Sequence, residues 1–265
     1  GLIVTIAHKA PAAYYRKPPS SGRMLAAGPP NLNDDLERFV LSAFRESNFD
    51  PDRGLEKIRA WTMKERLQRY IGEDRERMAA GAIQVVAREI ELDGEMLAPR
   101  RPVPVRFTGR IDRCESQGLV TRVIDYKTGV FNFTPGSMLK KTFSGADLAG
   151  SDEAAYLQAL NDFHAKYPGM QLLIYMLLLA EQEGKAWEHL DGAYVLLRSK
   201  DNFHRPLFVR NREPLGPEEM SAVMEGFRTD LGAVLDDLYA RDAFLANRSD
   251  ETACGYCPFR LACGS

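Results

Sequence analysis

The chain has few cysteines and no long hydrophobic stretch, and each absence disfavours a class of protein. Three of its four cysteines lie in the last dozen residues, a clustering that fits a reducing cytoplasm better than a disulfide framework. The longest apolar run, Leu172 to Ala180, is much shorter than the roughly 20 residues that cross a membrane. The apolar stretch Leu2 to Ala7 is too short for a secretory signal and has no basic leader. We therefore expect a cytoplasmic protein with no membrane partner.

The most informative segment has the pattern of a β-hairpin. Residues 103–113 and 119–127 are rich in β-branched and aromatic side chains, and residues 115–118, Glu-Ser-Gln-Gly, form a turn signal between them. Two such runs joined by a polar turn predict a hairpin. The second run ends in Asp-Tyr-Lys-Thr-Gly, and an apolar strand does not need these charges in order to fold.

Because side chains alternate along a strand, the charged residues of the hairpin can be assigned to its two faces. Asp125 and Lys127 share one face of their strand, and Tyr126 lies on the other. Asp112, on the partner strand, reaches the same side if the register allows. A surface hairpin with an Asp–Lys cross-strand pair is the alternative interpretation. Such pairs are common and contribute little stability, whereas this strand is strongly apolar.

Two carboxylates on adjacent strands suit a hard divalent cation. Mg²⁺ binds one or two carboxylates together with water and substrate phosphate oxygens. We expect Asp112, Asp125 and the main-chain carbonyl of Tyr126 to coordinate one Mg²⁺ or Mn²⁺ ion, which would lower the pKa of a water and stabilise charge on a phosphoryl group. We expect Lys127 to hold the attacking water or a phosphate oxygen.

The chain also lacks an overall positive charge, because its formal net charge is −2. The charges are unevenly distributed, however, and residues 98–113 contain five arginines and one aspartate. A local basic patch is sufficient to bind phosphates electrostatically. Ordinary solvated charge is the alternative, but Arg110 and Arg113 flank the candidate ligand Asp112. We therefore expect both arginines to contact DNA.

These motifs are similar to those of a known family. Gly109-Arg-Ile-Asp-Arg113, a turn and then Val123-Ile-Asp-Tyr-Lys-Thr-Gly129 resemble the RecB/AddB-type nuclease domain of the PD-(D/E)XK superfamily. That family also has a helix with the pattern Gln-x-x-x-Tyr, which Gln171 and Tyr175 match, and a spacing of four places both on one helix face. The resemblance implies the following catalytic residues: Asp112, Asp125, Lys127, Gln171 and Tyr175.

One position departs from the family pattern. The family usually has a metal-binding histidine on an early helix just before a Leu-Glu pair, and the counterpart of that pair here is Leu36-Glu37. Three residues before Leu36 stands Asn33 rather than histidine. Either Asn33 or water replaces the ligand, since oxygen donors are acceptable to Mg²⁺, or the site is weakened.

The C-terminal segment carries the cysteine motif Cys254-x2-Cys257-x5-Cys263. Thiolates at this spacing indicate zinc or an iron–sulfur cluster, with free thiols in a disordered tail as the alternative. The spacing resembles the cysteine set of AddB-type nucleases, which implies a 4Fe–4S cluster with a fourth cysteine far upstream. Residues 1–113 contain no cysteine, and we expect Cys114 to be a buried core residue. The fourth ligand is then missing or lies in a part of the protein outside this chain.

The order of expected elements matches the resembled family. Helices are expected at 32–48, 53–79 (one or two), 153–166, 169–183 and 217–241, and strands at 82–92, 102–114, 119–127, 193–198 and 207–210. The resemblance implies an α/β fold with a restriction-endonuclease-like core, that is, a mixed central sheet flanked by helices, with helical additions. We expect an N-terminal loop or linker (1–31), a nuclease domain (32–245) and a cysteine-containing C-terminal clasp (246–265).

The segment between the hairpin and the next helix, residues 129–152, contains Lys140 and Lys141. It is either a mobile loop that contacts DNA through these lysines or a disordered segment. Both lysines are included among the expected DNA-binding residues.

The leading functional interpretation is a Mg²⁺- or Mn²⁺-dependent deoxyribonuclease domain, expected to be an exonuclease. It would act on single strands or duplex ends with a helicase domain or subunit in double-strand-break repair and recombination. One alternative is an iron–sulfur exonuclease of the CRISPR-adaptation type, which the long charged segment 49–80 disfavours. The other is a catalytically weakened DNA-binding module, which Asn33 allows. Because the chain begins with Gly rather than Met, we expect a larger parent protein.

Overall fold

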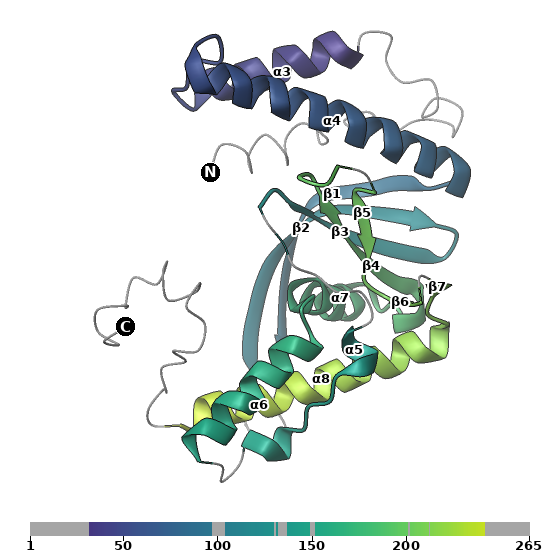
Figure 1. The fold of residues 1–265 in the computed structure, drawn as a ribbon. Helices are drawn as coiled ribbons and strands as arrows, with labels where there is room; N and C mark the ends of the chain where they lie inside the picture. The colour runs from purple at the N-terminus through teal and green to yellow at the C-terminus, as the bar shows by residue number, and fades with distance from the viewer. Residues whose placement is uncertain are drawn as a thin grey trace. The chain divides into compact units, whose positions relative to one another are not determined.

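The computed structural model describes residues 32–96, 104–129, 131, 137–148, 152–200, 202–211 and 213–241 (Figure 1). The described helices are α3 (Leu32–Glu46), α4 (Gly54–Gly81), α5 (Ser137–Lys140), α6 (Glu153–Lys166), α7 (Met170–Glu183) and α8 (Pro217–Ala240), with the 3-10 turns η1 (Gly145–Leu148) and η2 (Trp187–His189). The described strands are β1 (Gln84–Met96), β2 (Val105–Gln117), β3 (Val120–Lys127), β4 (Leu190–Leu196), β5 (His204–Pro206), β6 (Val209–Arg210) and β7 (Glu213–Pro214). None of the described helices is long and apolar enough to cross a membrane.

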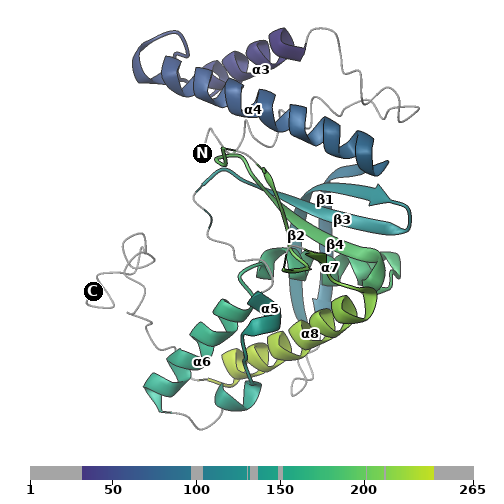
Figure 2. The ribbon, with the colours of Figure 1, turned by 45° about the vertical axis from the view of Figure 1, so that its right-hand side comes forward.

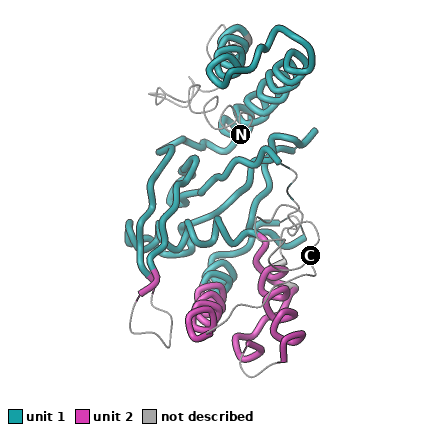
Figure 3. The backbone as a smooth tube through the Cα atoms, turned by 90° about the vertical axis from the view of Figure 1, so that its left-hand side faces the viewer, with its two compact units in different colours: residues 1–95, 106–136, 169–224 teal, residues 96–105, 137–168, 225–265 magenta. Residues whose placement is uncertain are grey.

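The chain packs as two units, each built from separate stretches of sequence (Figure 3). Unit 1 comprises residues 1–95, 106–136 and 169–224, and unit 2 comprises residues 96–105, 137–168 and 225–265. The expected terminal segments, 1–31 and 246–265, lie outside the described residues. The division into linker, nuclease domain and clasp therefore stays a prediction.

Unit 1 is built on a mixed sheet of five strands in the order β1-β2-β3-β4-β5. The β2–β3 pair is antiparallel, β3 and β4 are parallel, and β4 and β5 are antiparallel. A parallel pair needs a long crossover connection, and the chain between β3 and β4 includes α7. A mixed sheet flanked by helices confirms the expected α/β fold.

The two faces of this sheet are covered by different helices of unit 1. Ile124 and Tyr126 of β3 and Val195 of β4 are buried in one core with side chains of α3 and α4. On the other face α7 packs against β3 and β4, and most of its apolar residues between Leu172 and Ala180 are buried. Figures 1 and 2 show the strands lying between α4 and α7. Because side chains alternate along a strand, even-numbered residues of β3 such as Ile124 and Tyr126 face α4, and odd-numbered ones face α7.

Helix α4 is one continuous helix of 28 residues. Its buried residues recur every three or four positions, as expected of a core-facing helix: Ala60, Met63, Leu67, Tyr70, Ile71, Asp74 and Met78. It ends where Ala82 adopts a left-handed conformation with φ of 49° and donates its N–H to the carbonyl of Met78. One residue of this buried stripe, Asp74, is acidic, and it is 0% exposed. A buried carboxylate requires hydrogen-bond or charged partners.

The hairpin between β2 and β3 turns later than the sequence predicts. Glu115 pairs with Arg122 and Gln117 with Val120, so the chain reverses at Gly118 and Leu119, with Gly118 at a φ of 61°. The predicted turn at residues 115–118 is therefore wrong. A glutamate in a polar tetrapeptide has the composition of a turn, but Glu115 is buried against arginine side chains.

The strand expected at residues 207–210 also differs from the structure. β5, at His204–Pro206, joins the central sheet beside β4, whereas β6 pairs with β7 in a separate two-stranded ribbon. Leu207 and Phe208 lie between β5 and β6 and are buried. Their apolar character reflects this packing rather than a place in a strand.

Unit 2 has its own apolar core, formed by η1, α6 and the C-terminal part of α8. Leu148, Tyr156 and Ala159 are buried together, and Val234 packs against them. The Tyr167 ring contacts Phe163 and Phe227, and the Tyr167 hydroxyl donates to Asp230 Oδ2 at 2.6 Å. α6 begins at an N-cap, Asp152, whose side chain accepts the N–H of Ala155, as expected at a helix start.

Candidate active site

The two candidate metal-binding carboxylates lie on neighbouring strands of unit 1. The register pairs Arg113 with Ile124, and one further step places Asp112 opposite Asp125. Residues opposite each other in an antiparallel pair point to the same face. Asp112 is 8% and Asp125 5% exposed, and the N–H of Tyr126 donates to Asp112 Oδ2 at 2.8 Å. The register thus fulfils the condition under which both carboxylates share a face.

Lys127 connects this carboxylate pair to helix α7. Its Nζ atom lies 2.8 Å from Asp125 Oδ2 and donates to Gln171 Oε1 at 2.7 Å. Gln171 in turn donates through Nε2 to the Tyr175 hydroxyl at 2.8 Å. The structure therefore brings Asp125, Lys127, Gln171 and Tyr175 into one chain of polar contacts, with Asp112 on the adjacent strand.

Two aromatic rings flank the Lys127 ammonium group, and neither contact was predicted from the sequence. Nζ lies 5.4 Å from the centre of the Phe131 ring and 5.3 Å from that of Tyr194. Ring faces at this distance attract a cation and limit its movement. Tyr194 pairs with Asp125 across the parallel β3–β4 ladder, a pairing that depends on how β4 is placed. Burial raises the pKa of the Tyr194 hydroxyl, and the Asp125 charge raises it further.

A glycine in β2 makes room for the tyrosine of α7. A Cβ atom on Gly109 would lie 2.5 Å from Tyr175 Cε1, closer than real Cβ contacts, so any larger residue would push the ring away. The absence of a side chain at Gly109 lets Tyr175 lie against β2 while its hydroxyl accepts from Gln171. The glycine of the Gly-Arg-Ile-Asp motif therefore has a packing role beside the polar site.

The donor set fits a hard divalent cation. Asp112 and Asp125 offer carboxylate oxygens, and Mg²⁺ typically uses one or two carboxylates with water and main-chain oxygens. Within the part of the chain that the structure describes, no group of three or more His, Cys, Asp or Glu side chains is placed to hold a metal. A nitrogen- and sulfur-rich zinc site is therefore not what these residues form, whereas a two-carboxylate Mg²⁺ or Mn²⁺ site is compatible with them.

The four residues expected to bind DNA differ in their surroundings. The Arg110 side chain is 63% exposed, and its Nε lies 3.0 Å from Glu89 Oε2. Lys141 is exposed and belongs to unit 2, whereas the side chain of Lys140 is outside the described part. Arg113 is 1% exposed and faces α4, because alternation sends it to the side opposite Asp112. The structure thus separates Arg113 from the active-site face and from solvent.

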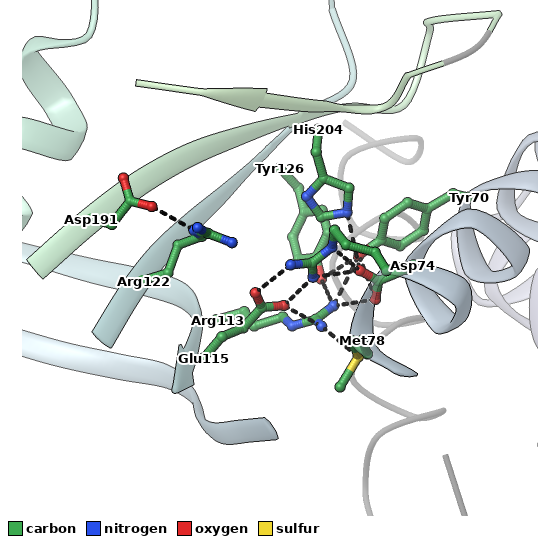
Figure 4. Close-up of polar contacts among 10 residues, drawn as sticks. Tyr70, Asp74, Met78, Arg113, Glu115, Arg122, Tyr126, Asp191 and His204 are labelled. Carbon is green, nitrogen blue, oxygen red and sulfur yellow. Dashed lines mark hydrogen bonds and ion pairs between the residues drawn. The ribbon is translucent and has the colours of Figure 1, made fainter. Parts of the chain in front are cut away.

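Arg113 belongs instead to a buried charged cluster between α4 and the sheet (Figure 4). The cluster is defined by these residues: Tyr70, Asp74, Arg77, Arg113, Glu115, Tyr126 and His204. Arg113 Nη1 lies 2.7 Å from Asp74 Oδ2, and Arg113 also forms an ion pair with Glu115. Arg77 joins the two carboxylates through Asp74 Oδ1 at 2.7 Å and Glu115 Oε1 at 2.6 Å. His204 Nε2 lies 3.0 Å from Asp74 Oδ1.

Electrostatics inside this cluster favour its charged forms. Burial by itself would raise the pKa of Asp74, but Arg113, His204 and Arg77 hold it well below its ordinary value. Burial would lower the pKa of the Arg113 guanidinium, but Tyr126, Tyr70, Asp74 and Glu115 raise it overall. The sequence contained one signal of this cluster: Asp74 lies on the apolar stripe of α4, three residues before Arg77.

Two further expectations concern residues that the structure describes only in part. Asn33 lies in α3, but its side chain is outside the described part, so its role as a metal ligand stays a prediction. Cys254, Cys257 and Cys263 also lie outside the described residues. Cys114 is 2% exposed, and burial, followed by the charge of Glu183, raises the pKa of its thiol to about 12. This confirms Cys114 as a core residue.

A comparison with protein families identifies the superfamily to which the chain belongs. A family model described as the PD-(D/E)XK nuclease superfamily matches residues 5–264. No curated protein matches the chain. Among solved structures, one titled "Crystal structure of SSO0001" is 14% identical over 87% of this chain and 84% of its own, with a TM-score of 0.29. At that TM-score the likeness carries no argument about fold or function.

Proposed function

Because the chain belongs to the PD-(D/E)XK nuclease superfamily, we propose that it is a divalent-metal-dependent deoxyribonuclease that acts through Asp112, Asp125 and Lys127. The observation that supports this most directly is the Lys127 ammonium group, held between Asp125 Oδ2 and Gln171 Oε1 beside a second buried carboxylate. A structural ion pair needs one carboxylate, whereas a metal-dependent phosphodiesterase site needs carboxylates that bind the cation and a positioned hydrogen-bond donor.

Each residue of the site has a role that follows from its contacts. Asp112, Asp125 and the carbonyl of Tyr126 would hold Mg²⁺ or Mn²⁺, which supplies positive charge to the transition state at phosphorus. Lys127 would orient the attacking water or a non-bridging phosphate oxygen through Nζ. Gln171 and Tyr175 keep that ammonium group at the edge of the carboxylate pair through bonds of 2.7 and 2.8 Å. Positioning of this kind contributes mainly in the transition state.

Three cations outside the catalytic residues are proposed to contact the substrate. We include Arg110, Lys140 and Lys141 in the DNA-binding set and leave Arg113 out of it. Arg110 is the best supported, because its side chain is 63% exposed and it lies two residues from Asp112 in the same strand. Phosphate contacts of this kind supply affinity that falls as salt rises.

The resemblance of the two hairpin motifs to RecB/AddB-type nucleases supports a more specific role. We propose exonuclease action on single strands or duplex ends, coupled to a helicase in double-strand-break repair. The same resemblance supports a 4Fe–4S cluster on Cys254, Cys257 and Cys263. Cys114 is not suited to be the fourth ligand, because it lies buried in the sheet of unit 1. Iron and sulfide analysis after anaerobic purification tests the cluster independently of the nuclease.

A catalytically weakened DNA-binding module is the second candidate, and Asn33 in place of the family histidine is what favours it. The two candidates differ in turnover. End-labelled single strands, linear duplexes and closed circles are incubated with Mg²⁺, with Mn²⁺ and with chelator. A metal-dependent exonuclease shortens the linear substrates and leaves the circles intact. Binding without any cleavage in either metal would reject the nuclease and support the binding module.

A further inference from the structure

Among the residues that the structure describes, Tyr126 of β3 contacts both the buried charged cluster and a carboxylate of the candidate active site. Its side chain is buried against α4, where its hydroxyl oxygen lies 3.1 Å from that of Tyr70 and 3.3 Å from Arg113 Nη1. Its ring meets the Tyr70 ring edge-on, with centroids 5.9 Å apart and planes at 84°. Its main-chain N–H donates to Asp112 Oδ2 at 2.8 Å on the opposite face.

The Tyr126 hydroxyl lies among buried side chains that are joined by several ion pairs. Asp74, Arg113 and Glu115 are at most 1% exposed, and each takes part in more than one ion pair of the buried charged cluster. Buried ion pairs seldom stabilise a fold more than apolar residues of similar size would. A fully connected polar network does, however, fix one arrangement of its members. The cluster therefore defines where the Tyr126 hydroxyl can lie.

The position of the Tyr126 hydroxyl in turn limits the position of the strand. Asp125 and Lys127 are the immediate neighbours of Tyr126, and Asp112 is held by its amide. Functional groups of an active site are productive only when held within about 0.5 Å of their required places. A side chain anchored on one face of β3 thus fixes the main-chain group that orients a carboxylate on the other face.

We propose that Tyr126 is a positioning residue of the cation site: its hydroxyl, anchored by Arg113 and Tyr70, places the amide that orients Asp112 and the strand that carries Asp125. This inference rests on the proposed function, because it assigns a role toward the divalent ion of that same site. It gives the buried charged cluster a function in catalysis although none of its charged side chains faces the substrate.

The test is the affinity for Mn²⁺ in the absence of DNA, measured by calorimetric titration of the whole chain. Tyr126→Phe removes the hydroxyl and keeps the ring. Loss of a hydrogen bond made directly to a metal ligand typically lowers metal affinity by about 10–100-fold. The Tyr126 hydroxyl acts one step further away, through the strand, so we expect the Mn²⁺ dissociation constant to rise by up to about 10-fold, the lower end of that range. Cleavage by the variant should then recover at higher Mn²⁺.

Tyr167→Phe is the matched control. It also removes a tyrosine hydroxyl that donates a hydrogen bond, to Asp230 at 2.6 Å, but it lies in unit 2. Its Mn²⁺ dissociation constant should equal that of the wild type. If Tyr126→Phe does not fold, Tyr70→Phe replaces it, because it removes one anchor of the same hydroxyl and leaves β3 unchanged.

The outcomes separate this inference from the function on which it rests. A wild type that binds Mn²⁺, with a folded Tyr126→Phe or Tyr70→Phe variant of unchanged affinity, overturns the positioning role and leaves the nuclease proposal standing. A wild type that binds no Mn²⁺ and does not cleave overturns the nuclease proposal itself. An equal loss of affinity in Tyr167→Phe would also overturn the inference, since the effect would then be a general consequence of losing a buried hydroxyl.

Discussion

The strands β2 and β3 carry a polar cluster on each face, and the two clusters differ in composition and in exposure. On the α7 side lie two carboxylates, Asp112 and Asp125, and Lys127, which contacts Asp125 and remains 24% exposed. On the α4 side, the carboxylates of Asp74 and Glu115 meet the guanidinium groups of Arg77 and Arg113, and three of these four residues are at most 1% exposed.

This difference separates the residues proposed to carry the chemistry, on the α7 side, from the residues that hold the strands in place, on the α4 side. Two carboxylates with two arginines balance in charge, and such a cluster can be closed off from solvent once its hydrogen bonds are made. Two carboxylates with one lysine carry an excess of negative charge, which favours a cation and an approach to substrate. Mutations on the α4 side should therefore change stability first, and those on the α7 side should change turnover first.

The largest expected effect is on the α4 side. Asp74→Ala leaves Arg113 and Arg77 without one of their carboxylates, and breaking a buried ion pair typically costs about 3–5 kcal/mol. We expect a loss of that size in the free energy of unfolding, measured by urea denaturation. Asp35→Ala is the control, because Asp35 is 49% exposed in its ion pair with Arg38, and such pairs contribute about 0–1 kcal/mol. Similar losses in both variants would refute the distinction.

The same carboxylate should make stability depend on acid. The pKa of Asp74 is held well below its ordinary value of 3.8, so the charged form is favoured in the folded state. Its contribution to stability is complete above the unfolded-state pKa and is lost as pH falls toward the folded-state pKa. The free energy of unfolding should therefore decline below about pH 4 more steeply in the wild type than in Asp74→Asn. Parallel declines would show that other groups control the acid sensitivity.

On the α7 side, Lys127→Ala should lower kcat by about 100-fold, the typical effect of removing a donor at a developing charge. The affinity for DNA should change little, and the free energy of unfolding should fall by less than in Asp74→Ala, because Lys127 is 24% exposed and water can replace part of its contact with Asp125. Lys185→Ala is a matched control, since Lys185 bonds Thr121 Oγ1 at the beginning of β3 and should not affect turnover. If the change in Lys127→Ala is confined to KM, Lys127 only contacts phosphate.

The smallest expected effect is that of disturbing the packing of helix α7 against strand β2. Gly109→Ala places a Cβ within 2.5 Å of Tyr175 Cε1, and overpacking of this kind costs about 1–3 kcal/mol. The displaced ring should also weaken the Tyr175–Gln171–Lys127 contacts and lower kcat modestly. Gly72→Ala, where a Cβ would meet nothing within 4 Å, should be neutral or slightly stabilising. Full activity and stability of Gly109→Ala would show that Tyr175 can move freely.

The α7-side site was predicted from the sequence better than the α4-side cluster. The reason is that its main residues lie within one hairpin, whereas the α4-side cluster joins separate elements. Asp112, Asp125 and Lys127 are grouped by strand alternation within one hairpin, which is local information. The Gln171 and Tyr175 spacing is also local, although their assignment to the site came only from the resemblance to the family. No such rule brings Asp74 to Arg113.

The errors have the same origin. Arg113 was expected to bind DNA, although alternation from Asp112 already places it on the other face. Glu115 has the composition of a turn residue, and only its burial against Arg77 shows that the strand continues. The place of Tyr194 beside Lys127 depends on the parallel pairing of β3 with β4, which no local pattern specifies.

The proposed metal-dependent nuclease activity is tested most directly by measuring Mn²⁺ binding and DNA cleavage on the same preparations of the wild type and of Asp125→Ala. We expect the wild type to bind Mn²⁺ and cleave DNA. We expect the variant to do neither, while it binds DNA within a few fold of the wild type. DNA binding should persist because removing a carboxylate lowers the repulsion of phosphate. A folded Asp125→Ala variant that binds Mn²⁺ and cleaves DNA as the wild type does would contradict the proposal.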